Sequence, residues 1–432
     1  MLILFGIIGL FYPEVRTQID TSKLNSGDIA WMITASGLVM LMTPGLGFFY
    51  GGMVRPKNII STILQSFISL GVISILWVVI GFSLTFGDDI GGIIGNPLTY
   101  FMFHNVGNAP NPNLAATIPL ALFAMFQLKF AIITPALITG SFAERVRFSS
   151  YLLFITLWSL LIYSPLAHMT WHPEGFLRTK GVLDFAGGTV VHMSAGIAAL
   201  AGAMFLGRRK VHLEGKSYEP ANIPYVLLGT GMLWFGWFGF NAGSALAAND
   251  QAANAFVTTN TASASAMLSW IFFDAIRGKK PSAMGACVGA VVGLVAITPA
   301  AGYVSTASSI LIGTIAAIVS NLAVSWKSKS TLDDTLDVFP CHGIGGIVGM
   351  IATAIFAKDV ELIFGKTETF IVHIISTIGV TIFVFVGSYI LYWFTNLLIP
   401  IRVTEEQEEK GLDISQHGES AYSLDPSVIK AS

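Results

Sequence analysis

Charged residues are scarce in this sequence, and cysteine is almost missing. Aspartate, glutamate, lysine and arginine make up 11% of the 432 residues, whereas hydrophobic residues make up 53%. Soluble globular domains carry about 25% charged residues, so water is not the main surroundings of this chain. The net charge is −2, and no long block of either sign indicates nucleic acid or an acidic partner. We therefore expect a lipid bilayer around the protein and no nucleic acid.

The two cysteines, Cys287 and Cys341, lie in or beside apolar segments. This excludes a disulfide framework and a thiolate metal site, and we expect two small buried side chains. An enzyme is the least favoured class, because no nucleophile, base and orienting group cluster in the sequence. We predict no catalytic residue, no cofactor and no bound metal.

Instead of charge, the sequence has a series of apolar runs. Each contains a stretch of about twenty mostly apolar residues, enough for a helix to cross a hydrocarbon core of ~30 Å. Polar residues, glycine or proline separate eleven such runs, at 28–50, 58–86, 115–141, 149–170, 186–206, 222–243, 252–276, 282–299, 303–325, 340–357 and 368–400. The predicted fold class is an all-α polytopic membrane protein with eleven transmembrane helices.

Lysine and arginine predict the orientation of these spans. Alternate loops hold most of those between the spans: Arg55, Lys57, Arg145, Arg147, Arg208, Arg209, Lys210, Lys216, Arg277, Lys279, Lys280, Lys327 and Lys329, followed by Arg402 after the last span. The other loops hold Arg178, Lys180, Lys358 and Lys366. The positive-inside rule places residues 1–27 outside and the tail 401–432 in the cytoplasm of an inner (cytoplasmic) membrane protein. The first eleven residues match a signal peptide only in part, so 1–27 is an extracellular segment or a residual signal.

An internal repeat divides the spans into two halves. The fifth span carries His192 and the tenth carries His342, each within the pattern H-x-x-x-G-I. Because each half has five helices, residues 28–206 and 222–357 must have opposite topology, which is an inverted repeat. The helix at 368–400 is an addition. In such folds the substrate site lies at the midplane between the halves, so we expect the two histidines to meet there.

The two histidines are the first candidates for function. An ionisable group inside a bilayer is costly, and a lone histidine in a span is more often a hydrogen-bonded packing residue. The paired positions of His192 and His342 favour a function instead. Neutral imidazoles donate or accept hydrogen bonds toward a small polar molecule, and without carboxylates they suit a hard metal ion poorly.

Aromatic residues form a second candidate group. Phe126 and Phe130 lie one helical turn apart, Trp171 ends the fourth span, and Phe240 with Ser244 ends the sixth. Interfacial aromatic belts are the plainer interpretation of each. Several ring faces beside a hydroxyl also bind a small monovalent cation, through cation–π attraction of about 2 kcal/mol when desolvated.

Two aspartates precede the histidine spans. Asp184 stands just before the fifth span, where it caps backbone N–H groups, and Asp337 stands likewise before the tenth. Because His342 is near the start of its span, the stretch 333–341 must enter the membrane as irregular backbone if His342 reaches the midplane.

The residues described so far resemble the ammonium transporter family (Amt/Mep/Rh), of bacterial or archaeal Amt type, from Gly37 to Tyr422. The segment from Asp184 through His192 to Arg209 is similar to the family signature. The further similar blocks are PGLGFFYGGMVR, AMFQLKFA, GSFAERVRFSSY, HMTW, GWFGFNAGS and DVFPCHG. The resemblance implies an eleven-helix homotrimer with one pore per subunit.

The resemblance also implies a role for each site residue. Trp171, Phe126 and Ser244 would recruit ammonium, with methylammonium as its analogue. Phe130 and Phe240 would form a gate beneath them. His192 and His342 would line the pore that ammonia crosses, and Asp184 would be the essential aspartate, structural or in deprotonation. The tail, similar to the family's regulatory tail, implies a PII-type signalling protein as a cytoplasmic partner.

Two alternatives remain beside ammonium transport. An ammonium sensor would use the same binding site and signal through the tail, and a transporter of larger amines is a minor possibility. Lys129 departs from the family pattern, because an uncharged residue is expected between Phe126 and Phe130. We expect its long stem to lead the charge away from the pore on another face of the helix.

Overall fold

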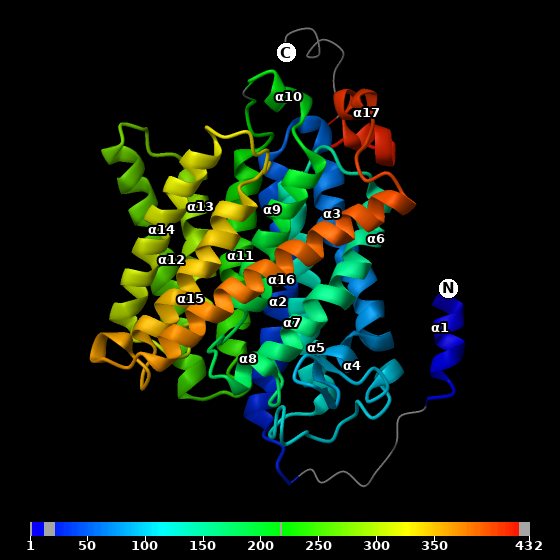
Figure 1. Cartoon of the computed structure of the whole chain (residues 1–432), viewed down its shortest axis with the longest axis vertical. Coiled ribbons are helices and arrows are strands. Elements are labelled where there is room, and N and C mark those ends of the chain that lie inside the picture. Colours follow the sequence, from blue (N-terminus) through cyan, green and yellow to red (C-terminus); the bar gives the residue numbers. More distant parts are fainter. Residues whose placement is uncertain (1, 13–21, 217, 423–432) are drawn as a thin grey trace.

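The computed structural model describes residues 2–12, 22–216 and 218–422, and this part of the chain is mostly helical (Figure 1). Its two strands, β1 (Asp89–Ile90) and β2 (Ile94–Gly95), form a short antiparallel pair. We call the end of the molecule that carries α8 the outer end. The end that carries α10 and α17 is the inner end (Figure 1).

The long helical segments run between these two ends. Their helices are α2 (Ser26–Met53), α3 (Ile59–Leu76), α4 (Phe82–Phe86), α5 (Leu120–Phe142), α6 (Phe148–Trp158), α7 (Ser164–Trp171), α9 (Ser194–Leu206), α11 (Ile223–Gly243), α12 (Asp250–Ile276), α13 (Ala283–Ile297), α14 (Thr306–Lys327), α15 (Gly345–Phe356) and α16 (Glu368–Leu398). α3 with α4, as well as α6 with α7, each form one such segment. Short helices are α1 (Leu2–Gly9), α8 (Phe176–Thr179), α10 (Lys210–Leu213) and α17 (Glu405–Lys410).

Nine helical segments of the described residues are long and apolar enough to cross a membrane. This confirms the all-α polytopic class. The spans predicted at 252–276 and 282–299 correspond to α12 and α13. α12 is long but too polar for the same measure, and α13 is too short at 15 residues. The count of eleven transmembrane helices therefore stays a prediction.

Four of the long helical segments contain a wider, π-helical turn. Residues 77–81 join α3 to α4, and residues 159–163 join α6 to α7. The other two, Gly188–Met193 before α9 and Phe339–Ile344 before α15, hold His192 and His342. π-helical turns are rare and are frequent at functional sites. Each histidine therefore lies in its own π-helical turn, and the two turns begin corresponding helices, α9 and α15.

Close helix contact through glycine brings these two turns together. A Cβ atom on Gly196 of α9 would lie 2.0 Å from the backbone nitrogen of Gly343, which no side chain tolerates. α2 and α11 approach in the same way, since a Cβ on Gly229 would lie 2.3 Å from the nitrogen of Phe49. Small residues let membrane helices pack at such short range. The Gly196 contact sets the crossing point of the two halves.

Residues 333–337 are irregular and mostly buried, whereas residues 339–341, also predicted to be irregular, belong to the π-helical turn of His342. The N–H groups of Thr335 and Leu336 donate to the carbonyl oxygens of Ser141 and Gly140 at the end of α5, both over 3.1 Å. Asp337 has a positive φ of 58°. These hydrogen bonds satisfy the buried backbone without a helix.

Candidate functional site

The structure brings His192 and His342 together in the interior. Their Nδ1 atoms are 3.4 Å apart, and the ring planes are inclined by 34° with centroids 5.5 Å apart. At this distance one Nδ1 donates to the other. His192 and His342 are 1% and 3% exposed. The Nε2 atom of His192 is buried and has no hydrogen-bond partner among the described residues. A buried nitrogen of this kind has a hydrogen bond to offer to a small polar molecule.

Narrow apolar cavities lie on both sides of His342. The first, of about 10 Å³, is bounded by both histidines and otherwise by apolar or aromatic residues: Met42, Leu46, Phe49, Ile133, Leu137, Leu233, Trp237, Phe240 and Val291. The second, also about 10 Å³, leads inward from His342 past Phe49 and Val291 to Leu336. Since one water needs about 10–15 Å³, each cavity admits one small molecule at a time.

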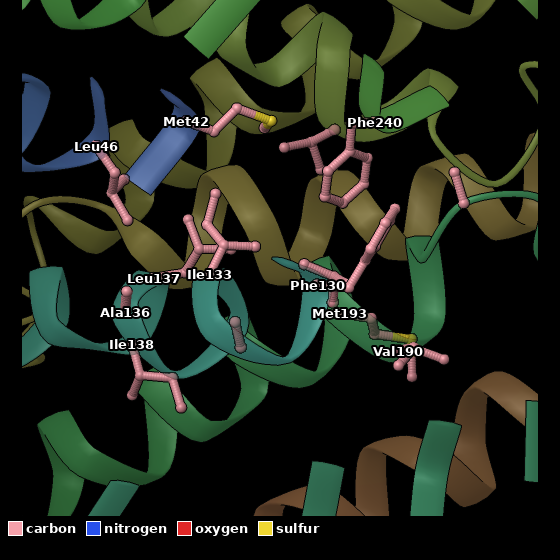
Figure 2. Close-up of a cluster of buried hydrophobic side chains, with 14 of the residues drawn as sticks. Met42, Leu46, Phe130, Ile133, Ala136, Leu137, Ile138, Val190, Met193 and Phe240 are labelled. Carbon is pink, nitrogen blue, oxygen red and sulfur yellow. The ribbon is translucent and has the colours of Figure 1, made fainter. Parts of the chain in front are cut away.

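Two phenylalanine rings separate these cavities from the outer end. Phe130 and Phe240 face each other with centroids 4.2 Å apart and planes inclined by 36° (Figure 2). Phe130 borders a wider cavity of about 230 Å³ toward the outer end, and Phe240 borders the narrow one. The two rings therefore form the boundary between a wide outer cavity and a narrow apolar path.

The outer cavity contains most of the predicted recruitment residues. Trp171 and Ser244 line it together with Gln127 and Asp184. The rings of Phe130 and Trp171 meet edge to face at 5.7 Å. The Ser244 hydroxyl donates to the Phe240 carbonyl oxygen over 2.8 Å and still has lone pairs for another donor.

Phe126, also predicted there, takes a different place. It is fully buried and is not among the residues that line the outer cavity. Its ring packs on Phe130 at 5.0 Å and lies close to Gly243, where an added Cβ would be 2.8 Å away. The structure thus places Phe126 behind Phe130, where it supports that ring.

Asp184 caps the turn that holds His192. Its Oδ1 accepts from the N–H groups of Gly187 and Gly188 over 2.8 and 2.7 Å. Its Oδ2 accepts from Thr189 and Val190 over 2.8 and 3.3 Å. Burial raises the pKa of this carboxyl, although the four N–H donors act in the opposite direction. The capping role predicted from the sequence is the one that the contacts support.

The corresponding cap of the His342 turn is Asp334 and not Asp337. Asp334 Oδ2 accepts from the Phe339 N–H over 2.8 Å, whereas Asp337 forms an ion pair with Lys327 at 2.7 Å. Burial raises the pKa of Asp334 to about 6. The sequence held a signal for this pair, because Asp184 and Asp334 each precede their histidine by eight residues (192 − 184 and 342 − 334).

Lys129 borders none of the three cavities that form the path. It is half-buried on α5, one turn from the exposed Met125, and has no hydrogen bond or ion pair with another described residue. Its side chain therefore lies off the path, as the sequence predicts.

Two residues near the site were missed at the level of sequence. The indole of Trp237 stacks on His192 at 5.1 Å and donates to Thr298 over 2.9 Å. His373 of α16 accepts from the Leu183 N–H over 2.9 Å and donates to the Met350 carbonyl over 2.8 Å. It therefore holds the loop that carries Asp184. Trp237 lies within a motif already singled out, whereas nothing around His373 signals its contacts.

Known proteins resemble this chain over nearly its whole length. The model of the "Ammonium Transporter Family" matches residues 30–422. A putative ammonium transporter of Methanothermobacter thermautotrophicus is 46% identical over 93% of this chain and 99% of its own. An ammonium transporter of Aquifex aeolicus is 46% identical over 97% and 99%.

Solved structures agree with this. Saccharomyces cerevisiae Mep2 superposes with a TM-score of 0.86 at 34% identity, covering 94% of each chain. A structure titled "Sensor Amt Protein" has a TM-score of 0.84 at 31% identity and covers 90% of this chain and 98% of its own. By its sequence and its fold, the chain belongs to the ammonium transporter family, as a multi-pass membrane protein.

Proposed function

We propose that this protein moves ammonium nitrogen across the membrane by recruiting ammonium in the outer cavity and passing ammonia by His192 and His342. The observation that carries the proposal is the buried Nε2 of His192, which has no hydrogen-bond partner among the described residues and borders a cavity with space for one small molecule. An enzyme is not favoured, because the site offers hydrogen bonds and ring faces but no nucleophile with a base.

The outer cavity is suited to the charged form of the substrate. Ammonium donates to the Ser244 hydroxyl and lies against the faces of Trp171 and Phe130, each worth about 1–2 kcal/mol when water is excluded. Asp184 does not bind the ion directly, since both its oxygens already accept backbone N–H groups. It acts by holding the His192 turn in place.

The narrow path is suited to the neutral form. A bare cation in an apolar cavity costs tens of kcal/mol by Born solvation, so ammonium gives up a proton before it passes the rings of Phe130 and Phe240. One N–H bond breaks, the electron pair stays on nitrogen, and the proton passes to water in the outer cavity. Ammonia then exchanges hydrogen bonds with the imidazoles, which offset its lost hydration.

Contacts of the tail at the inner end support the proposal that transport is regulated from the cytoplasmic side. The tail is tied to the molecule there: Asp413 accepts from the N–H groups of Ile60 and Ser61 over 3.0 and 2.8 Å, and Glu408 accepts from Lys210 N–H over 2.7 Å (Figure 1). We place this end in the cytoplasm of the inner membrane, as the basic loops indicate. The homotrimer and a PII-type partner beneath it belong to the same proposal.

Flux measurements on reconstituted protein test the proposal. Methylammonium uptake into liposomes should fall about 5–150-fold in the His192→Ala plus His342→Ala variant, because two hydrogen-bond partners worth ~1–3 kcal/mol are lost. His212→Ala, at the inner end, is the matched control and should transport as wild type does. Uptake that survives the double substitution in a folded protein contradicts the twin-histidine path.

A sensor is the second candidate, favoured by the similarity to the structure titled "Sensor Amt Protein". It predicts that wild type binds ammonium in a calorimeter and yet carries none into liposomes. Transport at rates that depend on His192 and His342 would decide against it.

A further inference from the structure

Two histidines outside the path lie one helical turn apart near the outer end. His168 is in α7, and His172 is the first residue after the end of this helix. The pair therefore has the i, i+4 spacing that presents two imidazoles on one face of a helix. Asp89 of β1 lies against them. The ligand atoms of these three side chains are all within 4.8 Å of one another, and the proposed transport mechanism uses none of them.

His168 is already oriented as a metal ligand would be. Its Nδ1 donates to the Thr85 carbonyl oxygen over 2.9 Å, which turns Nε2 toward Asp89 Oδ1, also at 2.9 Å. Metal-binding histidines commonly donate their second N–H to a backbone carbonyl in this way. Because the carbonyl oxygen can only accept, Nδ1 is the donor, and Nε2 beside the carboxylate is the nitrogen left to bind a metal ion.

His172 completes the group and is the adjustable member. Its ring stacks on that of His168 at 4.4 Å with planes inclined by 12°. Its Nδ1 accepts from the Glu174 N–H over 3.3 Å, which is long for a hydrogen bond, so turning the ring costs little. A tetrahedral zinc ion lies in the plane of each imidazole ligand and separates its ligand atoms by about 3.3 Å, so the His172 ring has to turn out of its stack on His168 for the three donors to reach one ion.

The site is reachable from the outer end. A cavity of about 390 Å³ is lined by His172, Asp89 and two further carboxylates, Asp88 and Glu174. These carboxylates attract a cation and are within the same cavity as the ligands, together with space for water at an open coordination position. Imidazole and carboxylate together suit Zn²⁺ and similar late transition metals, whereas Ca²⁺ and Mg²⁺ prefer oxygen alone.

We propose that His168, His172 and Asp89 form a binding site for a divalent late transition metal ion of the Zn²⁺ type. The site lies beside the outer cavity, because both cavities share Phe86, Asn113 and Leu114 as walls and Trp171 lies between the two histidines in sequence. A dication bound there repels ammonium in the outer cavity. This inhibition rests on the proposed transport function, whereas metal binding does not.

Direct binding to the purified full-length protein in detergent is the test. Equilibrium dialysis with Zn²⁺ should give one ion per chain in wild type, and Ca²⁺ or Mg²⁺ should not compete. His172→Gln and Asp89→Asn should each weaken Zn²⁺ binding by at least about 10–100-fold. His212→Gln, a histidine at the inner end, is the matched control and should bind as wild type does.

The outcomes separate the site from the transport mechanism. Absence of stoichiometric Zn²⁺ in wild type, or unchanged binding in both folded variants, overturns the metal site and leaves His168 and Asp89 as a structural ion pair. Zn²⁺ should also lower methylammonium uptake in wild type and not in His172→Gln. If Zn²⁺ binds and wild-type uptake is unchanged, the inhibitory role is overturned, although the site itself is supported.

Discussion

The turns that hold His192 and His342 are similar in backbone and different in how they are held. Each is π-helical and has an aspartate eight residues before its histidine. Asp184 accepts four backbone N–H groups. Asp334 accepts the Phe339 N–H through Oδ2, and its buried Oδ1 has no hydrogen-bond partner in the described part of the chain.

This difference teaches where rigidity is concentrated. Next to the outer cavity, every lone pair that the cap offers is matched by a backbone donor, and the histidine packs against Trp237 and Phe240, which also contact each other. Near the inner end, a basic side chain contributes instead, since Lys327 donates to the Asp334 carbonyl oxygen over 2.6 Å and pairs with Asp337. The two halves of the inverted repeat therefore share the π-helical turn and differ in the contacts that stabilise it.

Replacing each capping aspartate by asparagine should give the largest difference in stability between the two turns. Asp184→Asn puts an amide NH₂ where two N–H groups now donate, so two donors are left unsatisfied and the loss is about 2–6 kcal/mol of unfolding free energy. Asp334→Asn directs its NH₂ into the place of the unpartnered Oδ1 and costs less than about 1 kcal/mol. Thermal unfolding in detergent compares them, and equal losses would contradict the difference.

The crossing of the two turns is tested by adding a single methyl group. In Gly196→Ala the added Cβ would clash with the Gly343 backbone. Overpacking of this kind lowers the unfolding free energy by about 1–3 kcal/mol or more. It should separate the imidazoles and reduce methylammonium uptake. Gly379→Ala is the control, because nothing lies within 4 Å of its added Cβ and alanine favours a helix by about 1 kcal/mol. A Gly196→Ala protein of wild-type stability and uptake would show that the turns are not in contact there.

The support of the outer turn reaches α16 through His373. His373→Phe removes the acceptor of the Leu183 N–H and costs about 1–3 kcal/mol, with a weaker apparent affinity for methylammonium as the Asp184 loop loosens. His373→Gln, which keeps an acceptor, should recover part of it. A purely structural role would lower stability and leave KM unchanged, so the concentration dependence of uptake distinguishes the two.

Lowering the pH should stabilise the inner turn. Because burial raises the pKa of Asp334 in the folded protein to about 6, the folded state binds a proton that the unfolded state releases above about pH 4. Its contribution is fully present below that lower value and is lost as the pH rises through about 6. The unfolding free energy should therefore increase by about 1–3 kcal/mol from pH 7 to pH 5, and the melting temperature should rise with it. Asp334→Asn should remove this increase.

The meeting of the two histidines could be predicted from the sequence, because H-x-x-x-G-I occurs at corresponding places in both halves of an inverted repeat. The all-α membrane class follows from the low charge content together with the length of the apolar runs. The place of Phe126 could not be predicted, since one helical turn puts Phe126 and Phe130 on the same face of α5 and only packing against Gly243 decides which ring meets the cavity. The capping role of Asp334 was also missed, because the positive φ of Asp337 turns that nearer carboxylate toward Lys327.

The smallest effect is expected from Lys129, on the helix that contacts both turns. Its charge is half-buried, unpaired within the described residues and off the path, so Lys129→Met should raise stability by no more than about 1 kcal/mol. Uptake of methylammonium should change less than about threefold, because Lys129 does not line the outer cavity or the narrow path. Lys129→Arg, which keeps the charge, is the matched control. A large gain in uptake for Lys129→Met and none for Lys129→Arg would instead place the charged end of Lys129 near the substrate. The outer half of the path would then be where this chain differs from the family pattern.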